Sequence, residues 1–338
     1  MKLLSKKFLM PAFAAVVGLS FAANESAAAD MNAKFSGRVT GYYWSGTAKA
    51  NDDADSISNT KFVHEGRFGV VASATEGEWK GSAKLELDTD SLQGASGYNR
   101  DHFVMLANKQ FYVVVGRKYA GELNYAGYVT EISDFLLTSN NVSRTQLVAV
   151  GLKGIPNISA NIGYVDVDNG ASDVTGFRPA VGYKADNFQV DAVYESITSQ
   201  ENDDRGGDDD NSTAVSSFGI GAKVSFGNID VFGNYENRTT TVETAADDVD
   251  TGDTEMVLGA NVGLGNNMGI TAGFKNDTTT MDDVDDTVTT AMTVAFRKTL
   301  AGVQIFGEYV SSSTTADDSS GVDGAKSNDL AAGMRYWF

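Results

Sequence analysis

The sequence predicts an all-β fold, a 16-stranded antiparallel transmembrane β-barrel. Apolar residues recur at every second position along most of the chain, and tight turns alternate with long polar connections. The last strand also ends in an aromatic residue, Phe338, that shares a face with other apolar residues. Because side chains alternate between the two faces of a strand, such strands can turn one face to lipid and the other to water.

The first 29 residues predict an export signal that is removed from the mature protein. Three lysines near the start form a basic head, an apolar run covers 8–23, and alanines precede the expected cut after Ala29. A cut after Ala23 is the alternative, and an uncleaved anchor is disfavoured because the apolar run is short for a membrane helix. Residues 30–338 are then expected to form a single barrel domain.

The composition excludes several classes of protein. The chain of 338 residues carries a formal net charge of −19, and removal of 1–29 makes it more acidic still. We therefore expect no nucleic-acid partner, since phosphate recognition needs lysine and arginine. The absence of cysteine excludes disulfides and thiolate metal sites. Only His64 and His102 could serve a histidine-based catalytic or zinc centre, and no motif supports either, so we expect no enzyme.

Division of the chain at its turn signals gives sixteen candidate strands, an even number as in bacterial outer-membrane barrels. In one of them Val303, Ile305 and Tyr309 lie on the face opposite to Gln304 and Glu308. The candidate strands are 34–45, 61–74, 78–88, 100–107, 110–118, 143–152, 157–166, 174–185, 187–197, 214–225, 228–239, 254–263, 267–276, 287–297, 301–311 and 328–338.

The connections between these strands sort into two kinds. The tight turns lie at 76–77, 154–156, 186–187, 227–228, 265–267 and 298–300. The long polar connections include 46–60, 89–99, 119–142, 198–213, 240–253, 277–286 and 312–327. Outer-membrane barrels have short periplasmic turns and long external loops, which assigns the two ends. An even strand number brings both termini to the tight-turn end, where the first and last strands can pair and leave no open edge.

The expected barrel is too wide for side chains to fill. Sixteen tilted strands give a backbone diameter of about 30 Å, so the lumen holds water or a loop. The connection 119–142 is the longest, and it combines carboxylates with aromatic and aliphatic residues. We expect this third loop to fold into the lumen as the constriction element, with Glu122, Glu131 and Asp134 as its carboxylates.

Basic residues occupy strand positions that face away from lipid. They are Arg38, Arg67, Lys80, Lys84, Arg178, Lys223, Arg297 and Arg335. Arg117 and Arg144 flank the third loop and are expected to anchor or line it. Opposed charges across a narrowing create a transverse field that orients dipolar solutes.

Four short segments, together with the long third loop, carry a resemblance to a known family. The segments are Gly37-Arg38, Gly66-Arg67-Phe68-Gly69, Gly116-Arg117 and Arg335-Tyr336-Trp337-Phe338. With them the chain resembles, over essentially its whole mature length, the general porins of Gram-negative outer membranes. The resemblance implies a third loop inside the lumen, with Arg38, Arg67 and Lys80 forming a basic wall opposite its carboxylates. It also implies homotrimers, and a terminal signal of Phe338 and Tyr336 that the barrel-assembly machinery reads.

The function expected from these features is a water-filled outer-membrane channel for passive diffusion of small hydrophilic solutes and ions. Lipid and lipopolysaccharide would surround it, and the acidic balance favours a weak preference for cations. A substrate-selective channel and a mainly structural or adhesive surface barrel are the alternatives. A specific sugar channel should carry stacked aromatic residues along the lumen, where the sequence places few.

Aspartate runs mark three of the long loops. They lie at 203–210, 247–250 and 282–286, and they lack the spacing of a calcium-binding EF-hand because Gly252 comes one position early. We expect solvated acidic loops, no cofactor and no structural metal site. Loosely held divalent cations could bridge these loops to lipopolysaccharide phosphates.

Overall fold

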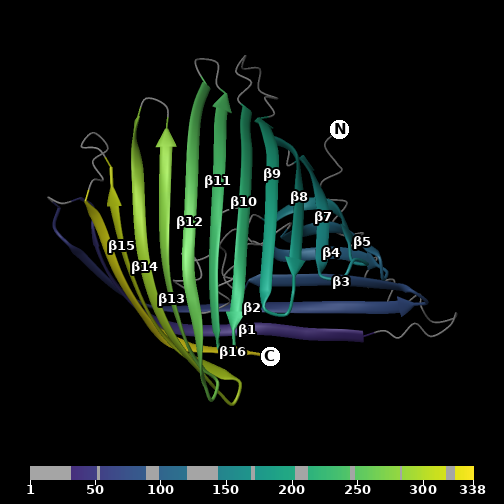
Figure 1. The fold of residues 1–338 in the computed structure, drawn as a ribbon, viewed down its shortest axis with the longest axis horizontal. Helices are drawn as coiled ribbons and strands as arrows, with labels where there is room; N and C mark the ends of the chain where they lie inside the picture. The colour runs from purple at the N-terminus through teal and green to yellow at the C-terminus, as the bar shows by residue number, and fades with distance from the viewer. Residues whose placement is uncertain are drawn as a thin grey trace.

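The computed structural model describes residues 32–51, 54–88, 99–119, 144–168, 172–201, 212–243, 248–281, 284–316 and 324–338. All sixteen predicted strands are present, and each pairs antiparallel with its neighbours in one closed barrel (Figure 1). No helix in these ranges is long and apolar enough to cross a membrane. The predicted export signal and nearly all of the predicted constriction loop lie outside the described residues.

The strands, in chain order, are β1 (Asn32–Lys49), β2 (Ile57–Glu76), β3 (Trp79–Asp88), β4 (Asn99–Ala107), β5 (Phe111–Tyr119), β6 (Arg144–Leu152), β7 (Ile158–Asp168), β8 (Ser172–Lys184), β9 (Phe188–Glu201), β10 (Ser212–Phe226), β11 (Ile229–Glu243), β12 (Asp248–Gly265), β13 (Met268–Met281), β14 (Val284–Leu300), β15 (Val303–Thr315) and β16 (Ala325–Trp337).

The barrel closes between its first and last strands, as the even strand number predicts. β1 and β16 pair in register from Arg38 opposite Trp337 to Lys49 opposite Lys326. Beyond the strand end, the Gly37 N–H donates to the Phe338 carbonyl at 2.8 Å, and the Phe338 N–H donates to the Gly37 carbonyl at 3.1 Å. The Phe338 ring packs against Gly37 so closely that a Cβ would not fit there. The final residue of the chain is therefore part of the seam.

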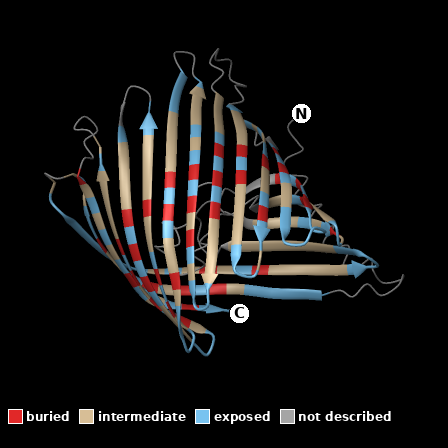
Figure 2. Ribbon diagram, viewed as in Figure 1, coloured by how far each residue is buried: buried red, intermediate tan, exposed pale blue. Residues whose placement is uncertain are grey.

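Burial alternates along the strands, as the two-residue pattern predicts. In β16, Ala331 and Arg335 are buried, whereas Leu330 and Met334 are 53% and 59% exposed. The same alternation appears as bands along β10–β14 in Figure 2. Large apolar side chains point outward on every side of the barrel, and such a surface would be unstable in water. It is the lipid-facing surface of a transmembrane barrel.

The tight turns lie at one end of the barrel and use residues that tolerate positive φ. Asn266 and Asn267, between β12 and β13, have φ of 51° and 59°, the combination that two-residue hairpins with a matching twist require. Gly77, between β2 and β3, has φ of 58°. Short connections of this kind fix the register of each hairpin, and with it the face on which each side chain lies.

The predicted loops 240–253 and 277–286 are too long, because the strands on either side of them extend further than predicted. β11 continues to Glu243, β12 begins at Asp248, and β13 and β14 reach to Met281 and Val284. Threonines, whose branched side chains favour strands, fill these extensions and bond across the sheet. The Thr279 hydroxyl donates to Asp253 Oδ1 at 2.8 Å, and the Thr280 hydroxyl donates to the Gly252 carbonyl at 3.3 Å. The prediction placed the loop bounds at the first polar residues. These strands continue as strands beyond the segment in which apolar and polar residues alternate.

We expect Met292→Lys to lower the free energy of unfolding by about 2 to 4 kcal/mol, because an ammonium at mid-membrane loses its hydration. Met292 lies at the middle of β14 with its side chain 65% exposed on the lipid face. Thr289→Lys is the matched control, because position 289 faces the lumen opposite Asp277. Its cost should stay below about 1 kcal/mol. Urea unfolding in lipid vesicles measures both, and equal losses would contradict the assigned faces.

Candidate functional site: the charged inner wall

A basic wall runs along the inner face of β16, β1 and β2. Arg38 and Arg67 lie directly opposite each other in the β1–β2 register, and Arg335 lies opposite Thr40 on the other side of β1. Arg38 and Arg335 are 6% and 1% exposed. The Arg38 Nη2 donates to Glu65 Oε2 at 3.1 Å, which fixes the guanidinium against the wall. The structure thus brings together two of the three predicted basic-wall residues and adds Arg335.

Two aromatic rings hold Arg335 in place. Its guanidinium carbon lies 5.6 Å from the centre of the Phe306 ring and 5.4 Å from the centre of the Trp337 ring. A guanidinium attracts the negative face of an aromatic ring, and it keeps its charge when buried more readily than an ammonium does. Arg335 is therefore a fixed positive charge beside the barrel seam.

The remaining predicted constriction residues are placed less closely together. Lys80 lies near the β2–β3 turn and is exposed, whereas Arg67 pairs with Asp88 at the far end of β3. Arg117 lies on β5 opposite His102 and is half-buried. Arg144 begins β6 opposite Tyr119, but its side chain is not described. The loop carboxylates Glu122, Glu131 and Asp134 lie outside the described residues.

The predicted assembly signal lies on the outer face. Tyr336 and Phe338 are 46% and 52% exposed, and their rings stack with centres 6.3 Å apart. The described structure shows that both rings are accessible from outside the barrel. Their recognition by the assembly machinery stays a prediction.

A second charged wall, rich in carboxylates, lies on β8–β13. Arg178 and Glu195 form an ion pair between β8 and β9, and both are buried. Glu236 on β11 lies opposite Glu255 on β12, and these are 3% and 4% exposed. Like charges placed opposite each other destabilise a sheet unless nearby cations compensate them.

Lys275 supplies that compensation from β13. Its Nζ lies 2.7 Å from Glu255 Oε2 and 3.6 Å from Asp277 Oδ2. A cavity of about 230 Å³ opens beside this group, lined by Glu236, Arg238, Asp253, Glu255 and Asp277. Four of these five residues are carboxylates, so this part of the wall is locally acidic.

Sequence reasoning missed these wall carboxylates and placed the negative side of the pore in the third loop alone. Glu195, Glu236 and Glu255 all occupy buried, inward positions. The same alternation that identified the inward arginines would have found them. Glu236, for example, follows Phe232 and Asn234 at two-residue steps on the face opposite to lipid.

The two charged walls lie on different sides of the lumen. In the ring of sixteen strands, β12 and β11 are five and six strands away from β1, so Glu255 and Glu236 are well separated from the β16–β1–β2 wall. Fixed charges of opposite sign on the two sides create a transverse field in the interior. The arrangement can orient dipolar solutes and bias the passage of ions without any reaction.

An apolar patch interrupts the inner wall on β5–β7. Val114, Leu147, Ala149 and Val165 are buried there, and Phe103 and Met105 on β4 pack against them. These side chains lie on the lumen face, because Val115, Val148 and Val150 next to them are the lipid-exposed ones. Val114 and Val165 are only 1% and 0% exposed, so little of the patch is left to water.

The described residues contain no group of three His, Cys, Asp or Glu side chains that could hold a metal ion. The predicted absence of cofactors and the loosely held cations at the acidic loops remain predictions, since most of those aspartates lie outside the described residues.

The fold is similar to those of solved outer-membrane proteins. The outer membrane channel DcaP of Acinetobacter baumannii is 13% identical, with a TM-score of 0.70 over 91% of this chain and 97% of that one. The anion-selective porin from Comamonas acidovorans is 15% identical, with a TM-score of 0.64 over 91% and 100%. The trimer form of OmpT, an outer membrane protein of Vibrio cholerae, is 12% identical, with a TM-score of 0.64 over 91% and 99%.

No model of a known protein family matches the chain, and no curated protein gives a significant match. At these low identities the likenesses establish the fold alone. The chain has the fold of the 16-stranded outer-membrane porins.

Proposed function

We propose that the protein is an outer-membrane porin that lets small hydrophilic solutes and ions diffuse passively through its lumen. One observation carries the proposal: the closed barrel is apolar on its outer face and ionised on its inner wall. A ring of sixteen strands is too wide to be filled by its own side chains. Charged side chains inside such a ring need water, and water across the membrane makes a pore. No catalytic step is needed for this function.

The proposed assembly is a homotrimer. A trimer form is known for the structurally similar OmpT of Vibrio cholerae, and closed cyclic symmetry is the common route to oligomers. Each protomer would carry its own lumen, so the trimer would contain three parallel pores.

Reconstitution of the purified protein tests both parts of this proposal. Liposomes that contain it should swell in small sugars at rates that fall smoothly with solute size, because a general pore selects by diameter. Planar-bilayer recordings should show conductance that closes in three equal steps. A saturable preference for one solute would favour the substrate-selective alternative, and absence of conductance would favour a structural barrel.

A weak preference for cations is part of the proposal. The acidic cavity on β11–β13 and the net charge of −19 support it, since a locally negative wall concentrates cations. The basic wall opposes this preference. Its guanidinium groups are held by aromatic and carboxylate contacts on one side of the lumen only. The expected preference is therefore modest.

Asp253→Asn combined with Asp277→Asn should move the reversal potential in a KCl gradient towards zero or towards chloride preference. Both side chains line the acidic cavity, and the changes remove two charges at nearly constant volume. Glu243→Gln with Asp248→Asn removes the same charge at the long-loop ends of β11 and β12 and serves as the control. An equal shift in the control, or chloride preference in the unmodified protein, would contradict the assignment.

The third loop is proposed to fold into the lumen onto the apolar patch of β5–β7. Support comes from the chemical match between that patch and the apolar part of the loop, which contains Phe135, Leu136 and Leu137. Burial of both surfaces against each other would remove apolar area from water. It would also place the carboxylates Glu131 and Asp134 inside the lumen.

Replacement of Phe135, Leu136 and Leu137 by serine should raise the single-channel conductance, because the loop would lose its apolar contact and leave the lumen. Leu147→Asn changes the wall side of the same contact and should raise conductance in the same direction. Planar-bilayer recording measures both variants. Unchanged conductance in both would refute the proposed position of the loop.

A further inference from the structure

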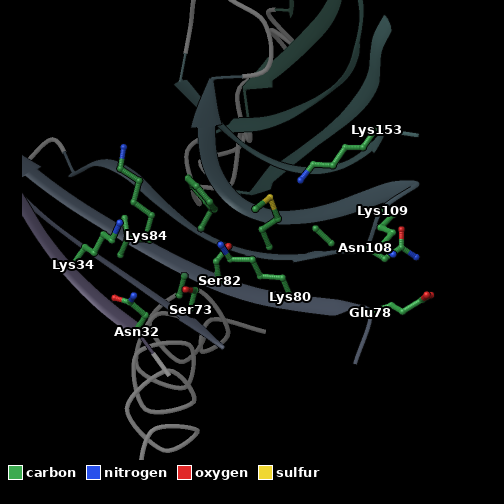
Figure 3. Close-up of a pocket in the computed structure, with 15 residues that line it drawn as sticks. Asn32, Lys34, Ser73, Glu78, Lys80, Ser82, Lys84, Asn108, Lys109 and Lys153 are labelled. Carbon is green, nitrogen blue, oxygen red and sulfur yellow. The ribbon is translucent and has the colours of Figure 1, made fainter. Parts of the chain in front are cut away.

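A cavity at the tight-turn end of the barrel gathers positive charge in an otherwise acidic protein. It has a volume of about 560 Å³, and it is lined by five lysines, Lys34, Lys80, Lys84, Lys109 and Lys153. Among the described residues, Glu78 is the one carboxylate in its lining. Figure 3 shows Lys34 and Lys84 at one end, Lys109 and Glu78 at the other, and Lys80 between them.

Strand register explains part of this clustering. Lys34 on β1 and Lys84 on β3 lie in one cross-strand row, on either side of Val71 on β2. Lys80 lies opposite Ala107, next to the β4–β5 turn that carries Lys109. Neighbouring strands are about 4.8 Å apart, so these ammonium groups can reach a common small ligand.

In the part of the chain that the structure describes, three of these five lysines have no ion-pair partner. Lys84 is neutralised, since its Nζ lies 2.8 Å from Glu86 and 2.7 Å from Asp101. Lys153 lies over the Tyr112 ring, 5.6 Å from its centre. Within the described ranges, Lys34, Lys80 and Lys109 form no ion pair. Like charges held together repel one another, so a bound anion would stabilise the group.

The site is also preorganised by hydrogen bonds between successive turns. The Lys153 N–H donates to the Gln110 carbonyl at 2.7 Å, which ties the β6–β7 turn to the β4–β5 turn. Within the latter, Asn108 Oδ1 accepts from the N–H groups of Gln110 and Phe111 at 2.8 and 2.9 Å. The amide NH₂ group of Asn108 therefore remains as a donor. A site that is rigid before binding loses less entropy when its ligand enters.

Hydroxyl and amide groups complete the lining. Asn32, Ser73 and Ser82 lie in one row of the β1–β2–β3 register, beside the lysines. Phosphate oxygens accept hydrogen bonds from hydroxyl and amide groups as well as from ammonium groups. This mixture fits a small ligand with several anionic oxygens better than it fits a single monovalent ion.

We propose that this lysine cavity is a binding site for small polyphosphorylated solutes at the periplasmic mouth of the pore. The site is separate from the two charged walls, and it would hold a polyanion in a channel that otherwise prefers cations. Its periplasmic position rests on the proposed function, because the tight-turn end faces the periplasm only in an outer-membrane barrel. Binding itself needs no pore and can be measured on the folded protein in detergent.

Calorimetric titration of the detergent-solubilised protein with inorganic tripolyphosphate tests the site directly. We expect saturable binding, weakened about tenfold or more, roughly 1.4 kcal/mol, in the variant K34Q/K80Q/K109Q. The control K184Q/K223Q/K298Q makes the same charge change on β8, β10 and β14 at the same end of the barrel. It should change the affinity less than about twofold if the contacts are local.

Absence of binding in the unmodified protein, or equal weakening in both triple variants, would overturn the proposal. Circular dichroism and heat-modified gel mobility establish that each variant is folded, and K80R, which keeps the charge, should retain binding. In planar bilayers, tripolyphosphate should reduce conductance at lower concentration from the tight-turn side than from the loop side. A protein that binds tripolyphosphate but does not conduct would refute the pore while leaving the site intact.

Discussion

Hydrogen-bond closure of the sheet is the constraint on which the rest of the structure depends. Hydrocarbon offers no partner for a backbone N–H or carbonyl, so an open strand edge could not persist in a membrane. Pairing of β1 with β16 removes the last edge. Once the ring is closed, every side chain must point either to lipid or to the lumen, and the alternation along each strand becomes obligatory. The two chemically different surfaces of the protein follow from that single geometric requirement.

The strands and their faces could be predicted because one physical signal, the two-residue period, is repeated along the chain. Leu330 and Met334 face lipid and Arg335 faces inward as that period requires. Strand ends were harder to predict, because a strand leaving the membrane no longer alternates in polarity. Thr279 and Thr280 were assigned to a loop because they are polar, yet both lie on β13 and their hydroxyls bond across the sheet to β12. Register, which a single strand does not reveal, determines those contacts.

The charged interior was only half predictable, for a related reason. Inward arginines such as Arg38 and Arg67 could be recognised as a set, but only the strand register shows that these two lie opposite each other. Lys80 shares their face yet belongs to a cavity near the turns. Inward carboxylates such as Glu236 were not predicted, because the third loop alone accounted for the negative charge that a constriction needs. The two charged walls and the lysine cavity therefore emerge only from the closed ring, which sets residues on different strands side by side or on different sides of the lumen.

The contact between Gly37 and Phe338 has a consequence for how the protein is made. Gly37 lies on β1 and Phe338 follows β16, the first and last strands of the ring, so the ring cannot close before β16 has been synthesised. Until then the chain carries two open strand edges, each able to pair with another copy. Loss of even one residue from the carboxyl end would remove both hydrogen bonds between Gly37 and Phe338 and leave the seam weakened where it begins.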